Sequence, residues 1–146
     1  MSEEDRHAIE SACRTLAIRS FVLIDSREWE PLADLYTEDA VFARPTAPDQ
    51  PILGRAAILA QYQTRPTSKV TRHFVANALI DVQAGDKAKG LLYVLLFTGT
   101  AETEAPSFPV AADPVQLVGE FRDDYILTTE GWRIARRAGN MIFRSG

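Results

Sequence analysis

Asp25 and His73, far apart in the sequence, have the chemistry needed to move a proton to and from carbon. The imidazole of histidine changes its charge near neutral pH, so it can accept a proton and return it. A carboxylate beside the ring can orient it and stabilise the imidazolium that forms. We therefore consider Asp25 and His73 as candidates for a general-base pair.

The surroundings of both residues favour burial. Asp25 continues the apolar helical line of Phe21 and Val22, so its carboxylate should lie at the end of an apolar stripe. A buried carboxylate without a partner is costly, and a partner is therefore expected. His73 belongs to a segment with strand-like alternation, which places Asn77 on the same face of the strand.

Each residue also has a purely structural interpretation. Asp25 could simply end its helix and face water beside Ser26. His73 could be a hydrogen-bonded core residue on a sheet face that meets a helix. The spacing of the two residues does not establish a pair, so both interpretations stay open on this ground alone.

Aromatic and polar side chains in the same elements are candidates for the wall of a substrate site. Tyrosine hydroxyls and an amide can donate hydrogen bonds to a developing oxyanion, and aromatic rings supply apolar surface. Because most aromatic residues serve packing, we expect only some of them to touch a substrate. The predicted substrate-binding residues are Phe21, Tyr36, Tyr62, Asn77, Phe97 and Tyr125.

Arginines near the end of the chain suggest a basic patch at first sight. Arg133 and Arg137 should share one face of the last predicted strand, and charged residues alternate on the strand before it. We expect these residues to form cross-strand charge pairs on a solvent-facing surface.

The sequence offers no motif for a metal or a cofactor. It contains two histidines and one cysteine, and their spacing matches no metal-ligand pattern. Glycine-rich phosphate loops and the G-x-S-x-G nucleophile motif are also missing from the sequence. We therefore predict no metal and no cofactor, a buried Cys13 on the apolar face of the first helix, and an exposed, inert His7.

Length and composition are those of one globular domain spanning residues 1–146. The net charge of −4 argues against nucleic acid as a partner, because binding phosphates requires clustered cations. The longest apolar run, Leu91–Phe97, is far shorter than the roughly 20 residues that span a bilayer. A lone cysteine and an acidic N-terminus without a secretory pattern favour the cytoplasm.

Periodicity predicts helices in the first part of the chain and strands in the second, the order of an α+β domain. The predicted helices are Glu4–Ser26, Glu30–Leu35 and Gly54–Gln63. The predicted strands are Ala40–Ala43, Val70–Val82, Lys87–Thr100, Val115–Thr128 and Trp132–Arg137. Prolines mark the segment around residues 45–51 as a loop, and residues 139–146 are expected to form a tail.

Several stretches together resemble the SnoaL-like branch of the nuclear transport factor 2-like superfamily. They are residues 21–29 with 35–40, 54–55, 71–77, and 119–123 with 131–134. The resemblance implies a cone-shaped α+β fold, with N-terminal helices on a curved antiparallel or mixed sheet around a pocket. It also implies a homodimer or homotrimer formed through the sheet. In the dehydratase and dehydrochlorinase members, an aspartate on the first helix orients a proton-abstracting histidine on a strand, and Asp25 and His73 stand at those positions.

The resemblance implies a cofactor-independent lyase of dehydratase type, or an isomerase, acting on a small, largely apolar, cyclic or aromatic molecule. The chain departs from better-known members, because a second strand histidine is missing and no cationic helper for a leaving halide can be assigned. Two alternatives stay open. One is a protein that binds a small hydrophobic molecule without turnover, and the other is an accessory subunit similar to the small subunit of ring-hydroxylating dioxygenases.

Overall fold

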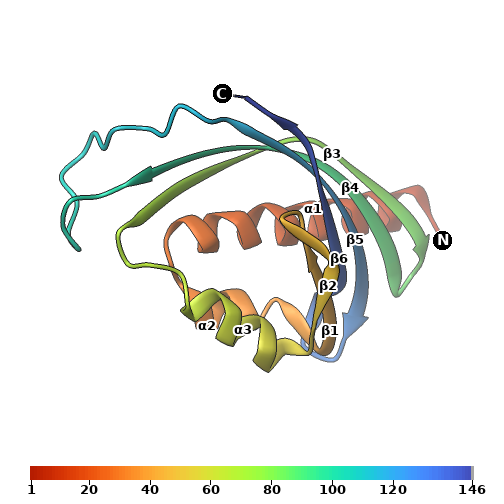
Figure 1. Cartoon of the computed structure of the whole chain (residues 1–146). Helices are drawn as coiled ribbons and strands as arrows, with labels where there is room; N and C mark the ends of the chain where they lie inside the picture. Colours follow the sequence, from red (N-terminus) through yellow and green to blue (C-terminus); the bar gives the residue numbers. More distant parts are fainter. Residues whose placement is uncertain (146) are drawn as a thin grey trace.

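Helices lie in the hollow of a bent sheet in the computed structural model, which describes residues 1–145. The helices are α1 (Glu3–Asp25), α2 (Trp29–Ala33) and α3 (Arg55–Gln63). The strands are β1 (Tyr36–Arg44), β2 (Ala47–Leu53), β3 (Lys69–Ala84), β4 (Lys87–Thr100), β5 (Leu117–Thr128) and β6 (Gly131–Arg144). Figure 1 shows the sheet arching over α1, with α2 and α3 beyond it beside β1. This arrangement confirms the predicted α+β cone.

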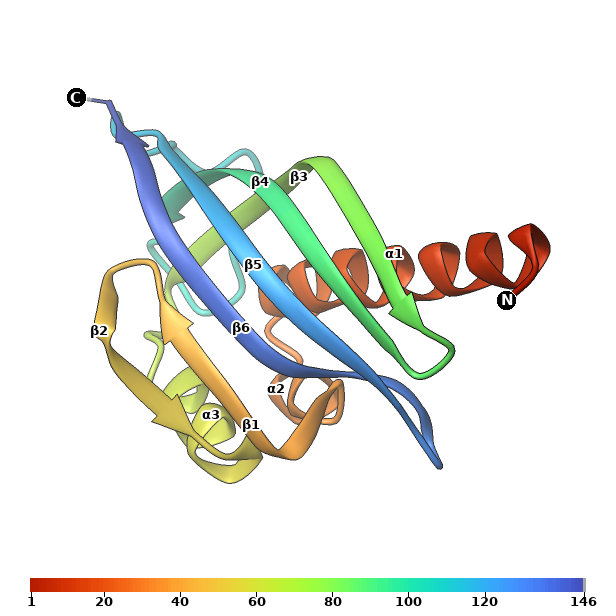
Figure 2. The same ribbon diagram turned by 90° about the vertical axis from the view of Figure 1, so that its right-hand side faces the viewer.

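The six strands form one mixed sheet in the order β2-β1-β6-β5-β4-β3 (Figure 2). β1 and β6 are parallel, and the other neighbouring pairs are antiparallel. α1 crosses the concave side of the sheet and packs chiefly on β3. Within residues 1–145, no helix combines the length and the apolar character needed to cross a membrane.

α1 begins and ends at residues that the sequence marks. Ser2 and Asp5 form a capping box, in which each side chain accepts a hydrogen bond from the backbone N–H of the other. One face of the helix is buried against the sheet at helical spacing. Its buried residues are Cys13, Leu16, Ala17, Ser20, Phe21 and Ile24. The predicted burial of Cys13 is confirmed. The last residue of the helix, Asp25, lies against the sheet.

Two boundaries differ from the predictions because strand pairing decided them. The proline-containing segment expected to be a loop includes β2, an edge strand paired with β1. Pro48 and Pro51 are tolerated there, because an edge strand does not need every N–H for pairing. β6 continues to Arg144 instead of ending at Arg137, because its pairing with β5 extends as far as Leu117.

A β-bulge changes which side chains of β3 face the helices. Asn77 has a φ of +48°, and the pairing of β3 with β4 is irregular at this position. His73 and Val75 face inward before the bulge, whereas Ala78 and Ile80 do so after it. Asn77 itself is exposed, so the prediction that it shares the face of His73 is wrong. Strict alternation fails because the bulge inserts one extra residue.

A second irregularity lies between β5 and β6. Tyr125 pairs with Ile134 and Asp124 pairs with Arg136, so β6 contributes one extra residue here. As a result, Ile134 and Arg137 are both buried although they are three positions apart. The prediction of a solvent-facing Arg137 is therefore wrong.

Candidate active site

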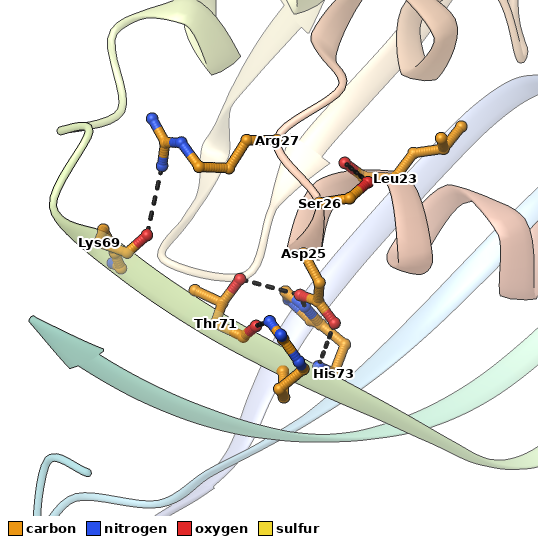
Figure 3. Close-up of polar contacts among 8 residues, drawn as sticks. Leu23, Asp25, Ser26, Arg27, Lys69, Thr71 and His73 are labelled. Carbon is orange, nitrogen blue, oxygen red and sulfur yellow. Dashed lines mark hydrogen bonds and ion pairs between the residues drawn. The ribbon is translucent and has the colours of Figure 1, made fainter. Parts of the chain in front are cut away.

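Asp25 and His73 are in direct contact at the end of α1. The Nδ1 atom of His73 lies 2.6 Å from Oδ1 of Asp25 (Figure 3). The side chain of His73 is only 10% exposed, and that of Asp25 only 12%. When Nδ1 donates its hydrogen to the carboxylate, the other ring nitrogen, Nε2, keeps a lone pair and can accept a proton.

Asp25 receives two further hydrogen bonds from β3. The hydroxyl of Thr71 donates to Oδ1 over 2.8 Å, and the backbone N–H of His73 donates to Oδ2 over 2.8 Å (Figure 3). A carboxylate at a helix C-terminus is disfavoured by the helix dipole. The two hydrogen bonds compensate for the unfavourable interaction of the carboxylate with the helix dipole. They also fix the plane of the carboxylate against the ring of His73.

Arg27 fastens the loop between α3 and β3 to the same region. Its guanidinium donates to the carbonyl oxygen of Arg65 over 3.1 Å and to that of Lys69 over 3.3 Å. The backbone of Arg27 is left-handed, with a φ of 60°, which turns the chain sharply after α1. The loop is thereby held next to the Asp25–His73 pair.

A cavity of about 410 Å³ extends from His73 between the helices and the sheet. This volume lies within the range of small-molecule sites, roughly 300–1,000 Å³. Most of its wall is apolar. The apolar lining residues include Phe21, Ile24, Phe42, Tyr62, Val94, Leu96, Phe121 and Met141. Of the residues predicted to bind substrate, Phe21 and Tyr62 therefore line the cavity.

Phe21 lines the cavity next to His73. Its ring centroid is 5.3 Å from that of His73 and 5.4 Å from that of Phe121. Such tilted and edge-on aromatic contacts limit the orientations open to the imidazole.

The other predicted substrate-binding residues lie elsewhere, and these predictions need correction. Asn77 is exposed at the bulge of β3, away from the cavity. Phe97 contacts Phe74 edge-on at 5.9 Å, and both belong to the outer face of the sheet. Tyr36 and Tyr125 are buried in the core and do not line the cavity. Burial is the main cause that raises the pKa of both tyrosines.

Arg137 is a site residue that the sequence patterns missed. Its Nε and one terminal nitrogen donate to Asp123 over 2.9 and 2.8 Å, and its other terminal nitrogen donates to Ser20 over 2.8 Å. The Arg137 and Asp123 side chains are 1% and 0% exposed. Burial is the largest single influence and lowers the pKa of Arg137, but the Asp123 carboxylate together with Tyr36 and Tyr125 outweighs burial and raises this pKa well above its ordinary value.

The guanidinium of Arg137 also lies over the ring of Phe21, 4.7 Å from its centroid, and lines the cavity. One sequence signal could have found it. Asp123 stands between Phe121 and Tyr125 at alternate, apolar positions of one strand face. A carboxylate on a buried face requires a cation, and a nearby arginine is the usual partner.

Tyr62 is a titratable residue of the cavity wall. Its ring is stacked between Trp29 and Phe42, at centroid distances of 5.5 and 6.1 Å. Burial raises the pKa of Tyr62, and the nearby charges of Arg137 and other arginines offset this only in part. The hydroxyl therefore stays protonated at neutral pH and can donate a hydrogen bond. Among residues 1–145, no group of three or more potential ligands is placed to hold a metal ion.

Fold and sequence together place the chain in the nuclear transport factor 2-like superfamily. Residues 4–138 match the SnoaL-like domain family, and the chain belongs to that family. A search of curated protein sequences found no match.

Solved structures share the fold over nearly the whole chain. A proposed scytalone dehydratase from Novosphingobium aromaticivorans has a TM-score of 0.83 at 20% identity, covering 99% of this chain and 91% of that one. A type 2 hexachlorocyclohexane dehydrochlorinase has a TM-score of 0.80 at 18% identity, covering 99% and 92%. A protein described as NTF2-like with a cystatin-like fold, also from N. aromaticivorans, has a TM-score of 0.70 at 26% identity, covering 95% and 82%.

Proposed function

We propose that this protein is a lyase of dehydratase type or an isomerase, in which His73 removes a proton from a carbon atom of a small, largely apolar substrate. The observation that carries the proposal is the 2.6 Å contact between Nδ1 of His73 and Asp25 beside an apolar cavity. The names of two structurally similar proteins, a dehydrochlorinase and a proposed dehydratase, favour elimination.

In the proposed reaction, Nε2 of His73 takes a proton from carbon next to a carbonyl group or next to the carbon that bears the leaving group. The C–H electron pair then forms a carbon–carbon double bond. In an elimination the bond to the leaving group breaks and that group departs with its electrons. In an isomerisation the electrons move to the carbonyl oxygen, and His73 returns the proton at another carbon. Asp25 stabilises the imidazolium in between.

Two side chains of the cavity are suited to the negative charge that develops. Arg137 presents a guanidinium that stays charged, and Tyr62 presents a protonated hydroxyl. Arg137 is held by its hydrogen bonds, and Tyr62 by stacking on Trp29 and Phe42, before any substrate binds. Such preorganised donors stabilise charge without reorganisation during the reaction.

The experiment uses the variants His73→Gln and Asp25→Asn with cyclic β-hydroxyketones, cyclic enones and chlorinated cyclohexanes. Reactions in deuterated water, read by mass spectrometry, detect both elimination and proton exchange at carbon. We expect His73→Gln to lower turnover by about 10²–10⁴-fold, the usual contribution of general-base catalysis. Asp25→Asn should also lower it strongly, because an amide does not stabilise the imidazolium.

His7→Gln is the matched control, because His7 is an exposed histidine on the first turns of α1. A second measurement needs no substrate. Proton NMR should show a low-field resonance for the short Nδ1–Asp25 hydrogen bond in the wild type and in His7→Gln, and it should be missing in Asp25→Asn. Unchanged turnover in His73→Gln would remove the proposed role.

We also propose that the protein forms a homodimer or homotrimer through the outer face of the sheet. Cross-strand neighbours on that face form an apolar row over four strands, which we call the outer row. It consists of Phe74, Leu95, Val118 and Phe143. Phe74 and Phe143 are 55% and 68% exposed, so the row would lose apolar contact with water on association.

A further inference from the structure

The charges that line the cavity are all of one sign, although the whole chain carries a net charge of −4. The cationic lining residues are Arg44, Arg65, Lys69 and Arg137, and the lining contains no aspartate or glutamate. Asp123 balances the charge of Arg137. Within residues 1–145, the ion pairs include none with Arg44, Arg65 or Lys69.

Arg44 carries a hydrogen-bond donor that lacks an acceptor among the described residues. Its side chain follows Phe42 on the inner face of β1, and both residues line the cavity. The Nε atom of Arg44 is buried and has no hydrogen-bond partner. Buried polar atoms are nearly always paired in folded proteins, and a charged donor gains most from pairing. No hydrogen bond or ion pair joins the Arg44 guanidinium to another described residue, so this cation is available to an acceptor on a molecule in the cavity that Arg44 lines.

Arg65 is held in place without an ion pair to a carboxylate. Its guanidinium lies over the rings of Tyr62 and Trp29, 5.6 and 5.9 Å from their centroids. Arg27 anchors the backbone carbonyl of Arg65, as described above. Stacking on aromatic faces leaves the edges of a guanidinium free for a planar anion. Arg44, Tyr62 and Arg65 all line the cavity, and the charges of both arginines lower the pKa of Tyr62, although burial raises it overall.

We propose that the substrate is a small apolar acid, whose carboxylate is bound by Arg44 and Arg65 with Lys69 nearby, and whose ring or chain extends toward His73. A carboxylate matches the planar fork of arginine. The aromatic wall of Phe21, Phe42 and Tyr62 fits the apolar body. The catalytic part of this statement rests on the proposed function, whereas the binding of the acid does not.

The test measures binding by calorimetry for pairs of ligands that differ only in charge. The acids are benzoate, phenylacetate and naphthalene-2-carboxylate, and each is compared with its primary amide. We expect at least one acid to bind about tenfold or more tightly than its amide, the size expected for a hydrogen bond to a charged group. Arg44→Gln and Arg65→Gln should each remove most of that preference.

Lys87→Gln is the matched control, because this exposed cation lies at the distant β3–β4 turn. It should keep the preference for acids. His73→Gln should keep it as well, even if turnover is lost, which separates this proposal from the proposed function. The proposal is overturned if no acid binds more tightly than its amide, or if the preference survives in both arginine variants.

Discussion

At the scale of single residues, two side chains paired with carboxylates support the site, the imidazole of His73 and the guanidinium of Arg137. Asp25 and His73 are slightly exposed and lie at the cavity wall. Asp123 and Arg137 are almost completely buried beneath it, and Ser20 occupies the remaining terminal nitrogen of Arg137. A buried pair of this kind adds little net stability, but the loss of one partner leaves an unpaired charge in an apolar environment.

Asp123→Asn should therefore destabilise the protein by about 3–5 kcal/mol, because Arg137 would lose its counter-charge. The measurement is the free energy of unfolding from urea titration. Asp124→Asn is the matched control, since Asp124 forms an exposed pair with Lys89 at 3.6 Å. Its cost should be below about 1 kcal/mol. Equal stability of the two variants would contradict the structural importance given to the buried pair.

At the scale of elements, the bulge in β3 determines which side chains of this strand face each side of the sheet. It lets His73 face the cavity at one end of the strand while Ile80 and Val82 face α1 at the other. The bulge depends on Asn77, whose φ of +48° is a region that asparagine tolerates and β-branched residues avoid.

Asn77→Val should lower the free energy of unfolding by about 1–3 kcal/mol, because a β-branched residue is strained at positive φ. Asn77→Gly should be close to neutral, since glycine adopts this conformation freely. Ala76→Val is the control on the neighbouring, exposed position of the same strand. If Asn77→Val were as stable as Ala76→Val, the backbone at residue 77 would not have the conformation described.

At the scale of the whole molecule, the two faces of the bent sheet carry different features. Its concave face holds the cavity and packs on α1, whereas its convex face carries the outer row. Because side chains alternate along a strand, Val94 and Leu96 can line the cavity while Leu95 between them belongs to the outer row.

Phe74→Lys should shift the protein from the oligomer to the monomer, because a charge would be placed in the proposed apolar interface. Sedimentation equilibrium at micromolar concentration measures the change. Val22→Lys is the control, since Val22 is similarly exposed, at 58%, but lies on α1. A wild type that is monomeric at these concentrations would contradict the proposed assembly.

Local sequence patterns predicted most of the elements and made Asp25 and His73 candidates for an acid–imidazole pair, without establishing their contact. Capping of α1, the long alternating strands and the acidic residue at the end of an apolar helix are signals between near neighbours in the chain. They predicted the helices and the long strands to within a few residues at most ends. The resemblance to the SnoaL-like family then added the contact that spacing alone left open.

Long-range pairing decided the rest. The proline-rich segment forms strand β2 because it pairs with the free edge of β1. Strand β6 is longer than predicted because it lies between β1 and β5 and pairs with both. The two irregular pairings turned Asn77 outward and Arg137 inward, against the alternation read from the sequence. The cations around Tyr62 come from separate segments of the chain. Local sequence patterns cannot predict these features, because a bulge and a cavity depend on strands that meet only in the folded chain.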